Sequence, residues 1–213
     1  MYWSLVKKDF EIAFCENIGI IVVQMLFILI IISVNMGVMG YGVMATAFGW
    51  QLLMGVSVKE KKNNSLALLI TMPYEKGKII TTRYISAMFG VVGATVIYEG
   101  LAFITNMINI NVLKMLTPEI LLTTVCAYAL FIGITLPLYF KFDDTVVRGV
   151  SLFLIMGVNI VGFLLWDHTN IISIISEMSF ITNNYKVILI LVTIVSLVIS
   201  RKITLILFEK MEF

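Results

Sequence analysis

The sequence predicts an all-α integral membrane protein with six transmembrane helices, and three observations support this fold class. Hydrophobic residues make up 60% of the 213 positions, and charged residues make up only 13%, against about 25% in soluble domains. The mean hydropathy is +1.03. Uncharged apolar stretches of about 20 residues recur, and this length crosses a hydrocarbon core of about 30 Å. We therefore place the chain in the lipid bilayer and expect no nucleic-acid partner.

The first residues predict an amphipathic helix at the membrane interface. Trp3, Val6 and Phe10 recur at helical spacing, while Lys7 and Lys8 fall elsewhere on the helix. Such a helix can lie in the interface with its apolar side toward the lipid. A simple basic anchor ahead of the first span is the alternative. Both interpretations put the segment at the inner leaflet.

Six apolar stretches are long enough to be spans. The first two form a helical hairpin, because no charge interrupts residues 18–58, and Asn35 with nearby glycines weakens helix continuity between them. Shorter polar segments separate the later spans. The expected spans are 18–36, 38–58, 84–108, 118–139, 149–166 and 187–200, with one long polar loop at 59–83.

Lys and Arg are distributed unequally between the two sides of these spans. In membrane proteins, cations in short loops are retained on the cytoplasmic side. With the N-terminus inside, thirteen of the fifteen cations are cytoplasmic, and only Lys114 and Lys186 lie outside. We therefore expect both termini and the loop 59–83 to be cytoplasmic in a multi-pass protein.

Two short helices are expected outside the spans. In the loop 59–83, Ser65 is a suitable N-cap, and Pro73 ends the helix because it disfavours helical backbone at the preceding residue. Its apolar side chains could dock a partner or lie against the membrane surface. Outside, residues 171–180 (IISIISEMSF) separate apolar from polar positions and predict a short helix at the outer interface. The apolar residues of the cytoplasmic helix are Leu66, Leu69, Ile70 and Met72.

The loop 59–83 resembles the first intracellular loop of bacterial ATP-binding cassette permeases of the type 2 exporter superfamily. The resemblance rests on the run from Glu60 through SLALLITMPYEKGKIITTRYIS. In that family a polar stretch leads into an LLxxLP element, then a basic residue, then an IVxxRY element that begins the third span. The glycine turn usual in the family is replaced here by lysines and asparagines. The matching residues are Leu68, Leu69, Met72, Pro73, Lys76, Ile79, Ile80, Arg83 and Tyr84.

This resemblance covers most of the chain and implies a function. The family places a coupling helix in this loop, seated in a groove of a separate ATPase subunit, and a re-entrant helix between the fifth and sixth spans. It implies a permease subunit of the bacterial plasma membrane, paired as a homodimer or with a similar permease and bound to two ATPase subunits that hold ATP and Mg. The implied coupling residues are Ser65, Leu66, Leu69, Met72, Pro73, Lys76 and Arg83.

The sequence lacks the motifs of several enzyme classes. No G-x-x-x-x-G-K-[ST] loop is present, so ATP hydrolysis is expected from another chain. With one histidine and no H-E-x-x-H, Cys/His cluster or G-x-S-x-G, a metal site or an intramembrane enzyme is poorly supported. We expect no enzymatic activity, metal or cofactor in this chain. A non-transporting sensor or immunity protein is a further alternative.

Several residues are candidates for the transport pathway or for a second ATPase contact. Glu99 lies deep in a predicted span, where an ionisable side chain costs on the order of 2.5–3.5 kcal/mol and normally faces protein or a wet cavity. It could line the pathway with Met36 and Met39, or it could snorkel outward or pair within the bundle. Asp143 and Asp144, in the second inner loop, could contact the ATPase or be solvated.

Small residues at four-residue spacing predict close contacts between helices. Gly90 and Ala94 are one such pair. In lipid, apolar side chains gain little by leaving lipid for one another, so small residues that let backbones approach closely favour association.

The expected cargo is amphipathic or hydrophobic. Minimal outer loops and a Met-rich first hairpin suit toxin or antimicrobial peptides, moved by alternating access, and a lipid or a hydrophobic drug is the alternative. Export is expected because the outer loops form no sizeable domain that could receive a binding protein. The resembled family also consists mostly of exporters.

Overall fold

A computed structural model of the protein describes residues 2–12, 28, 38–62, 75–108, 113–167 and 179–210. Within these ranges all regular structure is helical, which confirms the predicted all-α class. Of the first expected span only residue 28 is described, and the loop residues from Ser65 to Pro73 and residues 171–178 of the expected outer helix lie outside the described residues. The helices are α1 (Tyr2–Phe10), α3 (Val38–Lys62), α5 (Lys76–Met107), α6 (Pro118–Lys141), α7 (Asp144–Asp167) and α9 (Ser179–Glu209).

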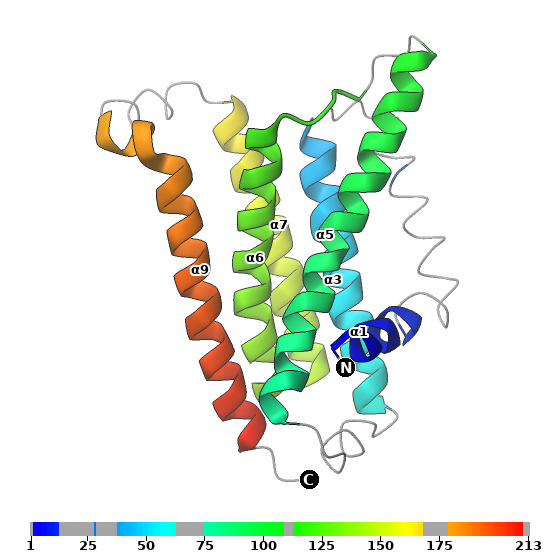
Figure 1. Ribbon diagram of the computed structural model, residues 1–213, viewed down its shortest axis with the longest axis vertical. Helices are drawn as coiled ribbons and strands as arrows, with labels where there is room; N and C mark the ends of the chain where they lie inside the picture. The colour runs from blue at the N-terminus through cyan, green and yellow to red at the C-terminus, as the bar shows by residue number, and fades with distance from the viewer. Residues whose placement is uncertain are drawn as a thin grey trace.

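The long helices α3, α5, α6, α7 and α9 stand side by side in an antiparallel bundle, and α1 lies across it near one end (Figure 1). Because the helices alternate in direction, one end gathers α1, the last turns of α3, α6 and α9, and the first turns of α5 and α7. We call this the charged end. It carries the thirteen cations expected on one side, and the opposite end carries Lys114 and Lys186.

Three of the described helical stretches have the length and composition to cross a membrane: Lys76–Met107, Pro118–Lys141 and Asn184–Glu209. Their outward faces expose large apolar side chains, such as Val96, Leu191 and Val198. A soluble monomer rarely exposes apolar patches of this extent. These faces are therefore suited to contact lipid, as the composition predicts.

Several helices run beyond the expected spans. α5 begins at Lys76, eight positions before the expected 84, and α9 extends from Ser179 to Glu209 rather than from 187 to 200. The physical reason is that Lys and Arg mark the depth of the membrane interface, but only residues such as proline and glycine interrupt a helix. The cations in these extensions consequently lie on helices.

Small residues bring α3 and α5 close together. A β-carbon added to Gly90 would lie 2.8 Å from Cα of Gly49, and Ala94 is fully buried. The predicted close contact is therefore confirmed at Gly90, with Gly49 as its partner. Tyr128 of α6 packs against the other side of Gly49, and its hydroxyl donates a hydrogen bond to the Ala87 carbonyl at 3.2 Å.

Hydrogen bonds made by side chains join the remaining helices. The Trp50 indole of α3 donates to Ser151 Oγ of α7 at 2.7 Å. On α9, Ser200 Oγ donates to the Gly133 carbonyl of α6 at 2.5 Å and pairs with the Tyr84 hydroxyl of α5. Such bonds contribute to helix association where burial of apolar surface supplies little driving force.

Candidate functional site

Charged side chains from three helices meet at the charged end. α1 contributes Lys8 and Asp9. The last turn of α3 contributes Glu60, and α5 contributes Arg83 and Ser86. We call these five residues the charge cluster. Its importance comes from its place in the chain, because it unites the N-terminal helix with the two helices that flank the expected coupling helix.

Arg83 is the centre of the charge cluster. Its Nη1 donates to Asp9 Oδ1 at 2.9 Å, and its Nη2 forms an ion pair with Glu60 Oε2. Lys8 Nζ donates to Glu60 Oε1 at 2.8 Å, and Ser86 Oγ donates to Asp9 Oδ2 at 2.9 Å. Both oxygens of each carboxylate are therefore bonded. A planar guanidinium can bridge two acids in this way, whereas a lysine ammonium is a single point charge.

The charge cluster is buried rather than spread over the surface. The exposed fraction is 1% for Glu60, 3% for Asp9 and 9% for Arg83. Apolar side chains surround it, including Leu52 and Leu136. Burial of an unpaired charge is very costly, so these groups hold one another in place, and removal of one leaves the others uncompensated.

The two carboxyl groups respond differently to this burial. Desolvation raises the pKa of Asp9 above its usual value and outweighs the opposing effects of Arg83 and Ser86. Desolvation also acts to raise the pKa of Glu60, but Arg83 and Lys8 together overcome it, and the pKa is lowered. The difference follows from the cations in contact, because Glu60 pairs with two and Asp9 with one.

Aromatic packing reinforces the attachment of α1 to α5. The rings of Trp3 and Phe10 lie edge-on to Phe89 of α5, with centroids 6.2 and 6.0 Å away. Val6 is buried, so the apolar side of α1 faces the bundle at this position, while Trp3 is 69% exposed. Lys59 Nζ also donates to the Ile12 carbonyl at 3.3 Å, which ties the end of α3 to the residues after α1.

The predicted coupling residues are only partly placed by the structure. Lys76 is exposed at the first position of α5, whereas Arg83 is turned into the bundle. Arg83 is therefore placed to hold helices together rather than to touch a partner surface. The other predicted coupling residues, Ser65, Leu66, Leu69, Met72 and Pro73, lie outside the described residues.

Sequence reasoning missed the partners of Arg83. The available signal was on α1, where Asp9 falls three positions after Val6 and directly before Phe10. That spacing puts an acid beside the apolar face of an amphipathic helix, where a carboxylate needs a buried cation. Glu60 was recognised only as part of the polar start of the loop, and its pairing with Lys8 depends on how the helices pack.

Other predicted residues are not part of the charge cluster. Asp143 is exposed between α6 and α7 at the charged end, and Asp144 begins α7. Met36 lies outside the described residues, and Met39 lies in the first turn of α3. Roles for these residues in coupling or in a pathway remain predictions. Within the described ranges, no group of three or more His, Cys, Asp or Glu residues is arranged to hold a metal.

Glu99 has a structural partner at the opposite end of the bundle. Its Oε1 accepts a hydrogen bond from the backbone N–H of Leu116 at 2.9 Å. The neighbouring Tyr98 donates from its hydroxyl to the Lys114 carbonyl at 3.2 Å. These two residues of α5 thus hold the segment that leads into α6. This contact favours pairing within the bundle, one of the two alternatives to a pathway role.

Substitutions at Glu99 separate these interpretations. Glu99→Ala should destabilise the protein by about 1–3 kcal/mol, because the Leu116 N–H loses its acceptor. Glu99→Gln keeps a carbonyl oxygen and should unfold at nearly the wild-type temperature, which thermal denaturation in detergent measures. If Glu99→Gln preserves stability but abolishes transport, the carboxylate acts in the pathway instead.

The bundle, its lipid-suited faces and its charge asymmetry define a multi-helix integral membrane protein. The sequence model of the ABC-2 family transporter proteins matches residues 4–209, nearly the whole chain, and the protein belongs to this family. It is thus a membrane component of an ABC transporter, a class in which a separate subunit normally supplies the ATPase. The resemblance of the loop 59–83 is confirmed at the level of the family. No curated protein and no solved structure matches the chain significantly.

Proposed function

We propose that this protein is the permease subunit of an ATP-driven exporter in the bacterial plasma membrane and moves amphipathic or hydrophobic cargo by alternating access. The charge cluster is the observation that carries the proposal. Glu60 precedes and Arg83 follows residues 63–74, and they pair with each other, with Lys8 and with Asp9, so both sides of the proposed coupling helix are tied to α1 through ion pairs. A force applied to this segment would act on α1, α3 and α5 together.

The proposed partners follow from the family. Two ATPase subunits bind ATP and Mg, and each seats a coupling helix of one permease, in a homodimer or a pair with a similar permease. Because ATP can shift the permease only through different affinities for its two states, the complex with ATP must favour one of them. Closure of the ATPases pushes the coupling helix, and the rigid assembly of α1, α3 and α5 transmits that movement.

Orientation is proposed from the charges. The charged end faces the cytoplasm, in accord with the retention of Lys and Arg on that side. Lys186 at the opposite end forms a surface ion pair with Glu119 at 2.6 Å. On the charged end, Asp143 is exposed between α6 and α7 and is available for a second ATPase contact.

For the cargo, toxin or antimicrobial peptides remain the first proposal, supported by minimal outer connections and the Met-rich first hairpin. A lipid or a hydrophobic drug is the second. The direction of transport is proposed to be export, because the resembled family consists mostly of exporters. A non-transporting sensor or immunity protein would need no ATPase, and the experiment below distinguishes it.

Charged substitutions in the proposed coupling helix test the assignment. Leu69→Asp combined with Met72→Asp should abolish association with the ATPase, because carboxylates cannot enter an apolar groove without partners. Tagged protein is purified from its native membranes, and copurifying ATP hydrolysis is measured. Met115→Asp, at an exposed methionine beyond the opposite end of α5, is the matched control and should retain the activity.

Two outcomes contradict the proposal in different ways. If the double variant keeps the wild-type level of copurifying ATPase, the coupling helix is not at Leu69 and Met72. If the wild-type protein itself brings down no ATPase, the non-transporting alternative is favoured. As a control, equal amounts of all variants in the membrane fraction would show that the substitutions leave membrane insertion unchanged.

A further inference from the structure

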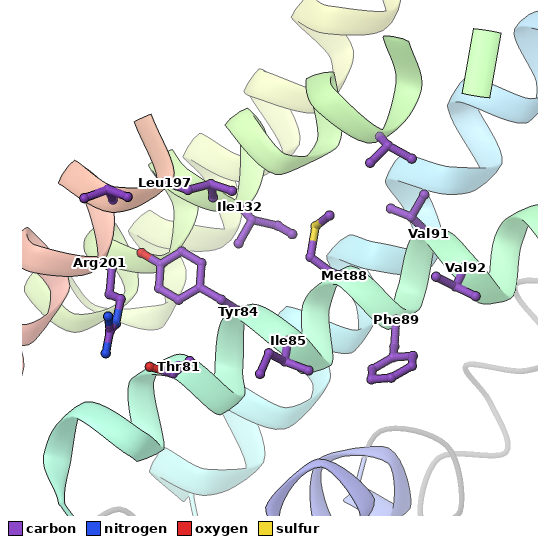
Figure 2. A pocket seen from close by; sticks show the side chains of 12 residues that line it. Thr81, Tyr84, Ile85, Met88, Phe89, Val91, Val92, Ile132, Leu197 and Arg201 are labelled. Atoms are coloured by element: carbon purple, nitrogen blue, oxygen red, sulfur yellow. The ribbon is translucent and has the colours of Figure 1, made fainter. Parts of the chain in front are cut away.

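An apolar groove lies between α5, α6 and α9, apart from the charge cluster. It has a volume of about 470 Å³. Figure 2 shows Tyr84, Met88 and Ile132 lining it, with Leu197 and Arg201 on the α9 side. The outer lips carry Ile85, Val92 and Val198, which are 37%, 55% and 52% exposed. The groove therefore opens sideways from the bundle, where membrane-spanning helices contact lipid.

The groove has the length of one lipid leaflet. Its lining on α5 runs from Thr81 to Val92. The eleven steps from Thr81 to Val92, at about 1.5 Å rise each, cover about 16 Å, close to half of a hydrocarbon core of about 30 Å. Since α5 begins at Lys76, the groove extends from the charged end to about the middle of the membrane. An acyl chain of one leaflet matches this length and this apolar lining.

A guanidinium lies at the charged end of the groove. Arg201 of α9 is exposed, and its Nη2 lies 4.0 Å from the position that a β-carbon of Gly77 would occupy. Among the described residues, no carboxylate pairs with Arg201, in contrast to Arg83. A planar guanidinium can bind a phosphate through two parallel N–H groups. The groove thus combines an apolar channel with a phosphate-binding group at its mouth.

We propose that this groove binds one anionic phospholipid from the leaflet at the charged end, with one of its two acyl chains along Met88 and Ile132 and its phosphate on Arg201. Basic pockets between membrane helices on the cytoplasmic side favour such lipids, because that leaflet is negatively charged. The assignment of this leaflet to the cytoplasm rests on the proposed orientation. The binding site itself does not depend on transport or on the ATPase.

The lipid would join the start of α5 to α9. Arg201 reaches toward Gly77 of α5, and Tyr84 already bonds to Ser200 and Thr204 of α9. A phosphate on Arg201 would therefore lie beside the helix that carries Arg83. A bound lipid is expected to stabilise the contact between these helices through mass action.

Native mass spectrometry of the full-length protein in detergent tests the site. Phosphatidylglycerol and phosphatidylcholine with identical acyl chains are added separately to wild type, Arg201→Gln and Lys202→Gln. Lys202 is the adjacent exposed cation and does not line the groove, so its substitution removes the same charge without removing the site. Loss of a charge-assisted phosphate contact should lower phosphatidylglycerol occupancy about tenfold in Arg201→Gln only.

Further outcomes test the two halves of the site. Val198→Trp should block the channel and reduce binding of both lipids, with wild-type secondary structure as the folding control. Inorganic phosphate should fail to displace phosphatidylglycerol, because it lacks the acyl chain; displacement would show a headgroup site alone. Equal binding of the two lipids by wild type, or equal losses in both glutamine variants, would overturn the proposal.

Discussion

Replacement of Arg83 by methionine is expected to destabilise the protein by about 3–5 kcal/mol, more than substitution of any exposed charge. Methionine fills a similar volume but leaves Asp9 without its cation and Glu60 with Lys8 alone. Both carboxylates are almost fully buried, so water cannot replace the lost partner. Thermal denaturation in detergent, followed by circular dichroism, should show a midpoint lower by roughly 10 °C.

Two further variants make this result specific. Lys7→Met removes a cation from the same α1 helix, but its pair with Glu11 is 3.7 Å long and exposed, so it should change stability by less than about 1 kcal/mol. Addition of Asp9→Asn and Glu60→Gln to Arg83→Met should recover part of the stability, because neutral amides tolerate burial better than unpaired carboxylates. If Arg83→Met melts at the same temperature as Lys7→Met, the charge cluster does not hold the three helices together.

The neutral triple variant also separates stability from coupling. If the ion pairs matter only for folding, the triple variant should regain both its stability and its ability to stimulate ATP hydrolysis by the partner ATPase. If they transmit movement from residues 63–74, stability should return while stimulation stays low. We expect the second result, because methionine and amide side chains cannot reproduce the two-pronged contact of Arg83 with α1 and α3.

The fold class could be predicted from sequence because lipid imposes strong demands on composition and length. Helix ends were harder to predict. Thr81, Thr82 and Arg83 were assigned to a loop, yet all three lie within α5, where the threonine hydroxyls donate to carbonyls four residues earlier. Hydropathy reports where the lipid ends, and a helix can continue into water past that point.

The candidate site was only half predictable for a related reason. The loop motif singled out Arg83 by resemblance, but Asp9 lies 74 positions away in sequence and Glu60 lies 23 away. Only the packing of α1 across α3 and α5 brings the three together. Likewise, the depth of Glu99 suggested a pathway, whereas its bond to the Leu116 backbone depends on how the residues just before α6 pack against α5.

The small-residue pattern was likewise predictable only in part. Four-residue spacing identified Gly90 and Ala94 as contact positions on α5; Gly90 lies where α3 approaches, and Ala94 is fully buried. The sequence could not predict which glycine of α3 contacts Gly90, because α3 contains several glycines. The register of the two helices selects Gly49, and the Tyr128 ring of α6 then closes over it.

Gly49→Ala is the second substitution for which we expect a large effect. A β-carbon at Gly49 would overlap the Tyr128 ring, which is fully buried and is fixed by the bond from its hydroxyl to the Ala87 carbonyl. To accommodate one methyl group, α3 or α6 must move, and overpacking of this kind costs about 1–3 kcal/mol or more. This loss should exceed the gain of about 0.5–1 kcal/mol that alanine gives over glycine in a helix.

Gly93→Ala is the matched control, since a β-carbon there meets nothing within 4 Å and the substitution should be neutral or stabilising. Thermal denaturation of both variants in the same detergent provides the comparison. Tyr128→Ala should be destabilising alone, because it leaves a cavity, but its combination with Gly49→Ala should cost less than the sum of the two. Strict additivity, or a Gly49→Ala variant as stable as Gly93→Ala, would show that α3 and α6 can separate freely at this point and that Gly49 does not set the spacing of the bundle.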